Sequence, residues 1–334
     1  SALQKEMGRG SEVICIGPSA EKLAQISCII THKGAAAGRS GLGAVMGSKR
    51  LKAVAVRGNQ EVPVADVARA NRIRQQHIDE LRQVKWGATG FWDLFHKYRT
   101  SGITANSAHS GDSPVKNWGG IGVVDLPNLG GLTGDAAIAN QTRQDTCWRC
   151  VMACEGILGE GKGAYKYAKG LRRLEYETHA SFGSLCNNTD IESINMANDI
   201  CNRYGLDTIA AGAVIAFAID CFENKVITLE DTDGIQLTWG NHRAMVAMTE
   251  RMARREGFGD VLADGIKKAA ERIGRGAQEF AVHVGGVEPG MHDPKFGLQG
   301  AREQAMARFQ MDATPGRHTQ HAFGREALAH HLVN

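Results

Sequence analysis

Residues 34–58 read "GAAAGRSGLGAVMGSKRLKAVAVRG", a stretch that surrounds a short apolar run with glycines and cationic side chains. Two interpretations fit it. Bare glycine backbone lets amide N–H groups approach phosphate oxygens, and an arginine adds a charge-assisted hydrogen bond. A tight turn with close backbone packing would use the same glycines. The stretch alone leaves both interpretations open.

Strand patterns flank this stretch, and helix patterns follow it. Runs at residues 11–17, 24–32 and 52–58 predict strands, with the Gly-rich stretch as a loop between the second and the third. Helical spacing is predicted over residues 61–83, 193–207, 207–225, 241–257 and 259–274. Residues 100–140, rich in Gly, Ser, Asn and Pro, predict an ordered loop. Strands before residue 60 and helices after it predict an α+β fold.

Composition excludes several classes of protein. The chain has 334 residues and a formal net charge of +3, which is too close to neutral for nucleic acid or an anionic membrane surface as the main partner. No stretch approaches roughly 18 uninterrupted apolar residues, and residues 1–10 lack a signal-peptide core. The sequence therefore predicts a soluble, cytoplasmic protein.

Three of the eight cysteines crowd into "CWRCVMAC", where Cys147, Cys150 and Cys154 follow the spacing C-x2-C-x3-C. On a turn followed by a helix, this spacing brings thiolates to one side, where they hold three corners of an iron–sulfur cubane. Zinc is a second interpretation, although no second cysteine or histidine pair completes a structural zinc site. Three buried structural cysteines are the third. The pattern favours the iron–sulfur cluster.

A second group of titratable residues lies in "LRRLEYETHASFGSLCNN", residues 171–188. If this segment is extended, Glu175, Glu177 and His179 share one face and are suited to acid–base chemistry. The alternative is a solvated strand face whose charge Arg172 and Arg173 balance. Taken alone, the pattern favours the solvated face.

The segment "NRYGLDT", residues 202–208, predicts the junction of two helices. Gly205 suits a left-handed cap at the end of the first helix, and Asp207 or Thr208 suits the N-cap of the second. Oriented amides and a carboxylate at such a junction suit a polar heterocycle, and a plain helix junction explains the same residues. Histidines in the Gly- and Pro-rich loops that follow are interpreted as surface residues: His283, His292, His318 and His321.

The motifs in series resemble one known family. "GRSGLGAVMGSKRLKAVAVRG", "CWRCVMAC", "EYET", "NRYGLDT" and "GMHDPK" occur in the order found in the tungsten-dependent aldehyde:ferredoxin oxidoreductases. The resemblance extends from about residue 10 to residue 320. It implies a β-rich N-terminal part that binds pterin, followed by mostly α-helical domains. The implied domains are residues 1–62, the end of the β-rich domain; 63–285, a helical domain with the cysteines; and 286–334, the start of the last helical domain.

The resemblance also implies the cofactors and the residues that bind them. They are tungsten (or molybdenum) held by two pterins, magnesium bridging the pterin phosphates, and a 4Fe–4S cluster. The phosphate-binding loop matches Arg39, Ser40, Gly41, Leu42 and Gly43. The pterin motif D-x-x-G-L-D, with the residue after it, matches Asn202, Gly205, Leu206, Asp207 and Thr208. The cluster ligands match Cys147, Cys150 and Cys154.

The implied activity is oxidation of a small aldehyde to a carboxylic acid. The active-site residues of the family match Glu177, expected to be the general base, and His318, expected to bind the substrate carbonyl oxygen. Ferredoxin or another electron-carrier subunit is the implied partner, and an oligomer is expected. Neither nucleic acid nor a membrane is expected as a partner.

Three departures from the family pattern stand out. Asn202 replaces an aspartate, and His179 stands where an aliphatic residue is expected, as an extra proton donor near the metal. The motif that supplies the fourth cluster cysteine is absent, so that ligand is expected outside this segment rather than at Cys186, Cys201 or Cys221. Two alternative functions remain: a tungsten subunit of the benzoyl-CoA reductase type, which His179 would suit, and an electron-transfer subunit that holds only a cluster.

Overall fold

The computed structural model describes residues 2–31, 34–86, 89–148, 150–295 and 316. Its N-terminal part is an antiparallel sheet with the strand order β3-β2-β1-β4. The elements of this part are α1 (Ala2–Met7), β1 (Glu12–Ile16), α2 (Pro18–Glu21), β2 (Ile29–Thr31), β3 (Ala35–Ala37), α3 (Leu42–Ser48) and β4 (Ala53–Val56). The expected strands form, although the second is shorter than its apolar run. The expected loop contains β3 and α3, so the Gly-rich stretch is mostly regular structure.

Small residues in α3 let this helix pack closely on the backbone at Cys28, just before β2. A Cβ at Gly43 would lie 2.7 Å from the amide nitrogen of Cys28, so only glycine fits at this point of the helix. Ile16, Ala20 and Met46 form the small apolar core between the sheet and the two helices.

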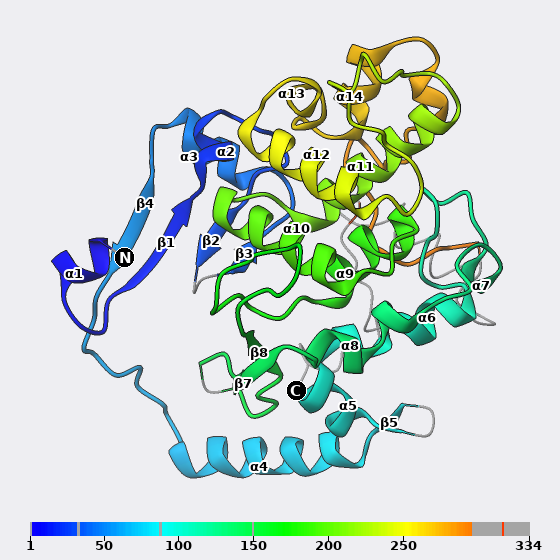
Figure 1. Cartoon of the computed structure of the whole chain (residues 1–334). Coiled ribbons are helices and arrows are strands. Elements are labelled where there is room, and N and C mark those ends of the chain that lie inside the picture. Colours follow the sequence, from blue (N-terminus) through cyan, green and yellow to red (C-terminus); the bar gives the residue numbers. More distant parts are fainter. Residues whose placement is uncertain (1, 32–33, 87–88, 149, 296–315, 317–334) are drawn as a thin grey trace.

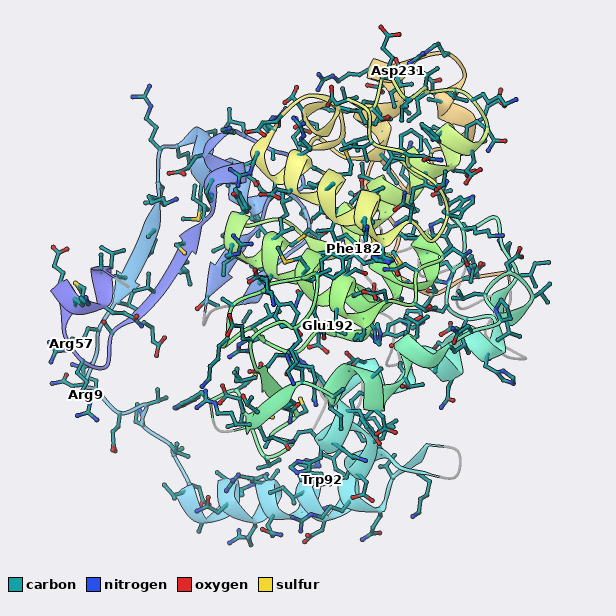
Figure 2. All side chains as sticks on the ribbon, in the orientation of Figure 1. Arg9, Arg57, Trp92, Phe182, Glu192 and Asp231 are labelled. Carbon is teal, nitrogen blue, oxygen red and sulfur yellow. The ribbon has the colours of Figure 1, made fainter. Side chains whose placement is uncertain are left out.

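A long exposed helix follows the sheet. α4 (Val67–Gln83) begins at Asp66, whose carboxylate accepts the amide hydrogen of Arg69 at 2.8 Å, and it buries none of its residues. In Figure 1 it lies along one edge of the molecule, joined to the sheet by an extended segment. The guanidinium of Arg82 lies 5.1 Å from the ring centre of Trp92 in α5 (Phe91–Tyr98). Trp92 is labelled in Figure 2. Between the two helices are the short strands β5 (Lys85–Trp86) and β6 (Thr89–Gly90).

Residues 99–138 fold largely into short helical turns, so the prediction of a loop over this region is wrong. These elements are η1 (Arg99–Ile103), α6 (Thr104–Ser110), α7 (Gly122–Asp125), η2 (Gly130–Leu132) and α8 (Gly134–Ile138). Buried side chains explain why this region forms regular structure, since Ser101, Thr104 and Leu132 are fully enclosed. The hairpin of β7 (Gln141–Asp145) and β8 (Glu155–Leu158) follows, with the cysteine run in its loop.

The main core is helical. Its elements are α9 (Tyr176–Phe182), η3 (Ser184–Cys186), α10 (Ile191–Tyr204), α11 (Thr208–Glu223), α12 (His242–Arg254), α13 (Phe258–Leu262), α14 (Ile266–Ile273) and η4 (Ala277–Phe280). α11 is buried almost throughout, as its apolar sequence predicts, and Phe182 of α9 lies among these helices (Figure 2). The single helix expected over residues 259–274 is wrong, because Gly265 has a left-handed φ of 89° and separates α13 from α14.

The fold class is confirmed: a small β part precedes a mostly helical body (Figure 1). Among the residues that the structure describes, no helix is both long enough and apolar enough to cross a bilayer. The boundaries expected at residues 62 and 285 stay a prediction.

Candidate functional site

A cavity of about 300 Å³ brings the Gly-rich loop together with the start of α11. Its wall combines five short segments of the chain. The lining residues are Gln25, Ile26, Gly38, Arg39, Ser40, Gly41, Asp207, Ala210, Asp264, Gly265, Gly286, Val287 and Glu288. The sequence analysis therefore identified two of the segments that line the cavity, those around Arg39 and Asp207. It missed Asp264 and Glu288, which sit in loops without a motif of their own.

Arg39 occupies the charged side of this cavity. Its Nε lies 3.2 Å from Oδ2 of Asp207 and its Nη2 3.9 Å from Oε2 of Glu288. It also donates to the backbone carbonyls of Gly316, at 2.9 Å, and of Glu288. The side chain is 7% exposed. Its donors are thus engaged with protein acceptors in this structure, and its role in binding phosphate stays a prediction.

The turn before α3 gives the cavity an open backbone edge. Ser40 and Gly41 both have left-handed φ angles, 74° and 67°. A Cβ at Gly41 would lie 2.5 Å from the carbonyl oxygen of Gln25, so close packing requires glycine. Leu42 begins α3 with a side chain that is 39% exposed, and it is not part of the cavity wall. Tight packing and an accessible edge thus coexist in one stretch.

The junction of α10 and α11 forms as the sequence predicts. Gly205 ends α10 with a φ of 78°, and Asp207 caps α11 by accepting the amide hydrogens of Ile209 and Ala210. Leu206 is buried. Asn202 donates to the Asn198 side chain at 3.2 Å in the last turn of α10.

Glu177 lies on a buried helix, not on a strand. α9 buries all of its residues, so both the extended segment and the solvated face expected from "EYET" are wrong. Glu177 is buried, and its Oε2 accepts the amide hydrogen of Met291 at 2.9 Å. The next residue, Thr178, shares a 2.7 Å hydrogen bond with Thr208 at the start of α11. α9 is therefore tied to the element that borders the cavity.

His179 does not share the face of Glu177. Residues two positions apart on a helix differ by roughly 200° in direction, so the side chains of Glu177 and His179 point apart. The Nε2 of His179 contacts the carbonyl oxygen of Gly131 at 3.0 Å and must donate to it, while Nδ1 lies 3.3 Å from the Thr104 hydroxyl. Burial lowers the pKa of His179 to about 4. The expectation that His179 shares a face with Glu177 is therefore wrong, and its role as an extra proton donor near the metal stays a prediction.

His292 is the residue that sequence reasoning missed. Its Nε2 lies 3.7 Å from Oε1 of Glu177, and its Nδ1 lies 3.0 Å from Oδ2 of Asp112. Its ring stacks on Tyr176 with the ring centres 4.9 Å apart. The sequence offered the loop "GMHDPK" only as one motif of the family resemblance, and His292 itself was interpreted as a surface residue. His318 lies outside the described residues.

The cysteines lie in the loop that joins β7 and β8, residues 146–154, hereafter the cysteine loop. The helix expected after its turn is absent from the described residues of this loop. Cys147 and Cys150 are exposed, and Cys147 Sγ donates to Oε1 of Glu155 at 3.2 Å. This hydrogen bond, followed by burial, raises the pKa of the Cys147 thiol. Burial is the main cause that raises the pKa of Cys154.

Buried charged side chains pack against the cysteine loop. Glu155 is paired with Arg172 and lies 3.6 Å from Arg99. Arg173 is 1% exposed and donates to the carbonyl oxygen of Cys154 at 2.6 Å. The other cysteines with a possible ligand role lie in the helical core: Cys186, Cys201 and Cys221.

The residues present differ in how well they fit the family's cofactors. The cavity has an exposed backbone edge at Ser40 and Gly41 and carboxylates at Asp207 and Glu288, so its residue types fit one pterin, while the donors of Arg39 are engaged with protein acceptors in this structure. In the cysteine loop the thiols suit iron, yet no group of three His, Cys, Asp or Glu side chains among the described residues is arranged as a ready metal site. The ligand types fit a cluster, and their arrangement is not pre-formed.

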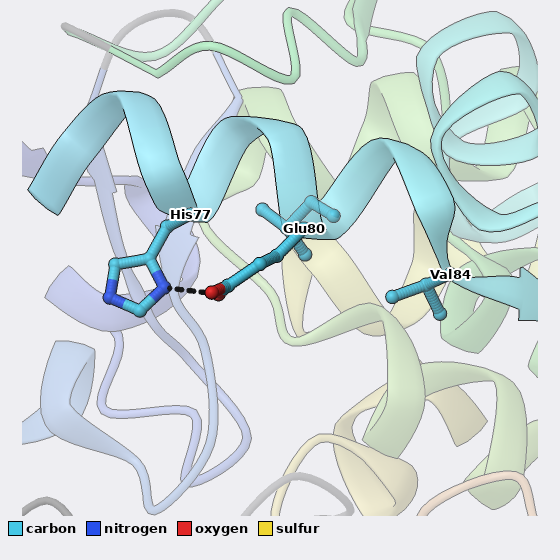
Figure 3. Close-up of a pocket in the computed structure, with 4 residues that line it drawn as sticks. His77, Glu80 and Val84 are labelled. Atoms are coloured by element: carbon cyan, nitrogen blue, oxygen red, sulfur yellow. Dashed lines mark hydrogen bonds and ion pairs between the residues drawn. The ribbon is translucent and has the colours of Figure 1, made fainter.

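A second, open hollow lies on α4 and the residue that follows it. His77, Glu80, Leu81 and Val84 line it, and Nδ1 of His77 lies 3.0 Å from Oε2 of Glu80 (Figure 3). Both side chains are more than half exposed, so their pairing adds little to stability.

Comparisons with known proteins agree with the motif order. Residues 1–58 match the model of the aldehyde ferredoxin oxidoreductase N-terminal domain, and residues 76–324 match that of domains 2 and 3 of the same family. The tungsten-containing aldehyde ferredoxin oxidoreductase of Pyrococcus furiosus is 33% identical over 303 residues, which cover 88% of this chain and 47% of that protein. The protein of the same name from Thermococcus kodakarensis is 32% identical, with the same coverage.

Two further similarities are more distant. The WOR-like subunit of an aliphatic sulfonate oxidoreductase from Pyrococcus furiosus is 28% identical over 84% of this chain and 44% of that protein. The solved active site complex BamBC of benzoyl coenzyme A reductase, in complex with 1,5-dienoyl-CoA, superposes with a TM-score of 0.68. It is 23% identical and covers 87% of this chain and 44% of that chain, which supports the fold alone. The chain spans about half the length of the curated relatives it matches.

Proposed function

Because the chain belongs to the aldehyde ferredoxin oxidoreductase family, we propose that it oxidises an aldehyde to a carboxylic acid. The reaction takes one water per aldehyde and releases two electrons and two protons. A tungsten (or molybdenum) bis-pterin, when bound, would supply the two-electron chemistry. The electrons would pass to ferredoxin or another one-electron carrier.

Glu177 is the residue that we assign to proton abstraction. Its carboxylate is buried, and a backbone amide fixes one of its oxygens, so it holds a defined direction. A positioned carboxylate of this kind contributes about 10²–10⁴-fold to rate as a general base. His318 is our candidate for the donor to the substrate carbonyl.

One observation carries the proposal. The segment at residues 286–292 lines the cavity with Glu288 and at the same time contacts Glu177 through Met291 and His292. The cavity beside Arg39 and the candidate base are thereby held by one short piece of chain. Arg39, Ser40, Gly41 and Asp207 would hold one pterin there, with magnesium at its phosphate.

The cysteine loop would hold the 4Fe–4S cluster through Cys147, Cys150 and Cys154. Its fourth ligand would come from elsewhere, since Cys186, Cys201 and Cys221 are enclosed in the helical core. The benzoyl-CoA reductase alternative would use His179 as a proton donor, and this side chain is enclosed between Gly131 and Thr104. The substrate assays below decide between the two reactions.

Substrate assays test the proposal directly. Anaerobically purified protein is supplied with aldehydes or with aryl-CoA thioesters, and a one-electron dye replaces the carrier, oxidised for aldehydes and reduced for thioesters. We expect aldehyde-dependent reduction of the dye and formation of the acid. Turnover of the thioesters without turnover of aldehydes would replace the proposal with the reductase alternative. Iron and sulfide without tungsten or molybdenum would favour a subunit that holds only a cluster.

A further inference from the structure

We propose that Asp112, His292 and Glu177 form a proton relay between the buried carboxylate of Glu177 and solvent. The inference rests on the proposed function, because it gives the proton taken up by Glu177 a way out. It adds two positioning residues, Asp112 and His292, to the candidate base Glu177 that the sequence motif identifies.

The first observation is that His292 lies between two carboxylates. Its Nδ1 is 3.1 Å from Oδ1 and 3.0 Å from Oδ2 of Asp112, while Nε2 faces Oε1 of Glu177 at 3.7 Å. An ionised carboxylate only accepts hydrogen bonds, so Nδ1 carries a hydrogen toward Asp112. In the neutral form of the ring, the lone pair of Nε2 then faces Glu177. The 3.7 Å separation is longer than a hydrogen bond, and such contacts commonly shorten when substrate binds.

The second observation is that all members are held in place. The His292 ring lies on the Tyr176 ring with a 27° angle between their planes. The Tyr176 hydroxyl donates to the carbonyl oxygen of Met291 and lies 3.3 Å from Ser113 Oγ, so it contacts the residue before His292 and the residue after Asp112. The amide hydrogen of Asp293 bonds to the Asp112 carbonyl oxygen at 2.5 Å, which ties the two segments together.

The third observation is a gradient of exposure. The side chain of Glu177 is 7% exposed, that of His292 24% and that of Asp112 30%. The other charged groups described nearby are Asp293 and Lys295, whose Oδ2 and Nζ are 3.4 Å apart, so they largely balance each other. The order of exposure gives the relay a direction, from the buried base to water.

The transfer is balanced at each step. Protonated Glu177 gives its proton to Nε2 of His292, and Nδ1 of the same ring releases its proton to the Asp112 carboxylate. Asp112 then releases a proton to water, so Glu177 and Asp112 both return to their ionised forms. His292 is left as the Nε2–H tautomer. The starting state returns when Asp112 passes a proton taken from water to Nδ1 and the Nε2 proton is lost to water, so one proton in total moves from Glu177 to solvent. No electrons move in this sequence.

Substitution of His292 tests the relay during turnover. His292→Phe keeps a ring over Tyr176 and removes both nitrogens. We expect kcat to fall about 100-fold with little change in KM, because proton removal becomes limiting, in the range typical of general acid–base groups. His292→Ala should recover part of its kcat when imidazole is added. The matched control is His242→Phe, whose imidazole pairs with Tyr165 away from this site and should leave kcat unchanged. A wild-type kcat in His292→Phe would overturn the relay.

A measurement without turnover separates this inference from the proposed function. Nitrogen-15 NMR of the histidine ring reports which nitrogen carries the hydrogen. We expect Nδ1–H for His292 in the resting protein and a shift toward Nε2–H in Asp112→Asn, whose amide can donate to Nδ1. Nε2–H in the unsubstituted protein would refute the relay even if aldehydes are oxidised. Nδ1–H in a protein that oxidises no aldehyde would leave the geometry intact and remove the proposed function.

Discussion

Helix α9 and the cysteine loop carry the two halves of the proposed chemistry, and they are built in opposite ways. Every residue of α9 is buried, and hydrogen bonds to distant segments fix its polar side chains. In the cysteine loop Cys147 and Cys150 are exposed, and Trp148 is 83% exposed. The comparison indicates that protein packing alone defines the acid–base group, whereas the cysteine ligands need iron or further protein to define their arrangement.

The largest expected effect comes from the α9 side of this comparison. Glu177→Gln keeps an oxygen that can accept from Met291, so we expect the fold and the metal content to remain. Loss of the base should lower kcat by about 10³-fold, or roughly 4 kcal/mol in activation free energy. Steady-state kinetics and elemental analysis of the same preparation check both parts. Activity close to that of the unsubstituted protein would remove Glu177 from the chemistry.

The second effect concerns the neutral imidazole on the other side of α9. The ordinary pKa of His179 is 6.5 and burial lowers it to about 4, so the unfolded state binds more protons between these values. Its contribution to stability is therefore complete above pH 6.5 and lost as pH falls toward 4, by about 3 kcal/mol. Denaturant unfolding at several pH values measures this loss.

His179→Gln serves as the control, because glutamine does not titrate. We expect its free energy of unfolding to fall less steeply than that of the unsubstituted protein between pH 6.5 and 4. Parallel pH dependences in the two proteins would show that His179 is not buried in its neutral form.

The third test separates ligand function from stability in the cysteine loop. Cys150→Ser should cause loss of iron while the free energy of unfolding of metal-free protein changes by less than about 1 kcal/mol, as expected for an exposed position. The matched control is Cys186→Ser, whose thiol is buried and donates to Ser181. We expect it to keep its iron and lose more stability. The reverse pattern would place the cluster in the helical core.

The smallest effect is expected at the exposed tryptophan. Trp148→Ala should change the free energy of unfolding by less than about 0.5 kcal/mol, since most of its surface already contacts water. Thermal unfolding of metal-free protein measures the difference. A cost of about 2 kcal/mol or more would mean that packing does define this loop.

Local signals predicted much of this fold. Gly205, Asp207 and Asn241 cap helices where the sequence expects helix ends, because caps depend on residues within one turn. Tertiary packing overrode local patterns elsewhere. The alternation in "EYETH" suggested a strand, yet the segment is a helix enclosed on all sides.

The candidate site was predictable only in part for the same reason. Cys147 and Arg39 belong to local patterns that can be recognised in a sequence. His292 depends on Asp112, 180 residues away, and Glu177 depends on Met291, 114 residues away. No spacing rule records such pairs, so a histidine in a Gly- and Pro-rich loop looked like a surface residue.

Elemental analysis of anaerobically purified protein tests the central claim most directly. The claim is that the cavity beside Arg39 and the cysteine loop hold a metal–pterin and an iron–sulfur cluster in one protein. We expect tungsten or molybdenum together with iron and acid-labile sulfide, and loss of iron in Cys150→Ser. Zinc in place of iron, or iron without tungsten or molybdenum, would contradict it.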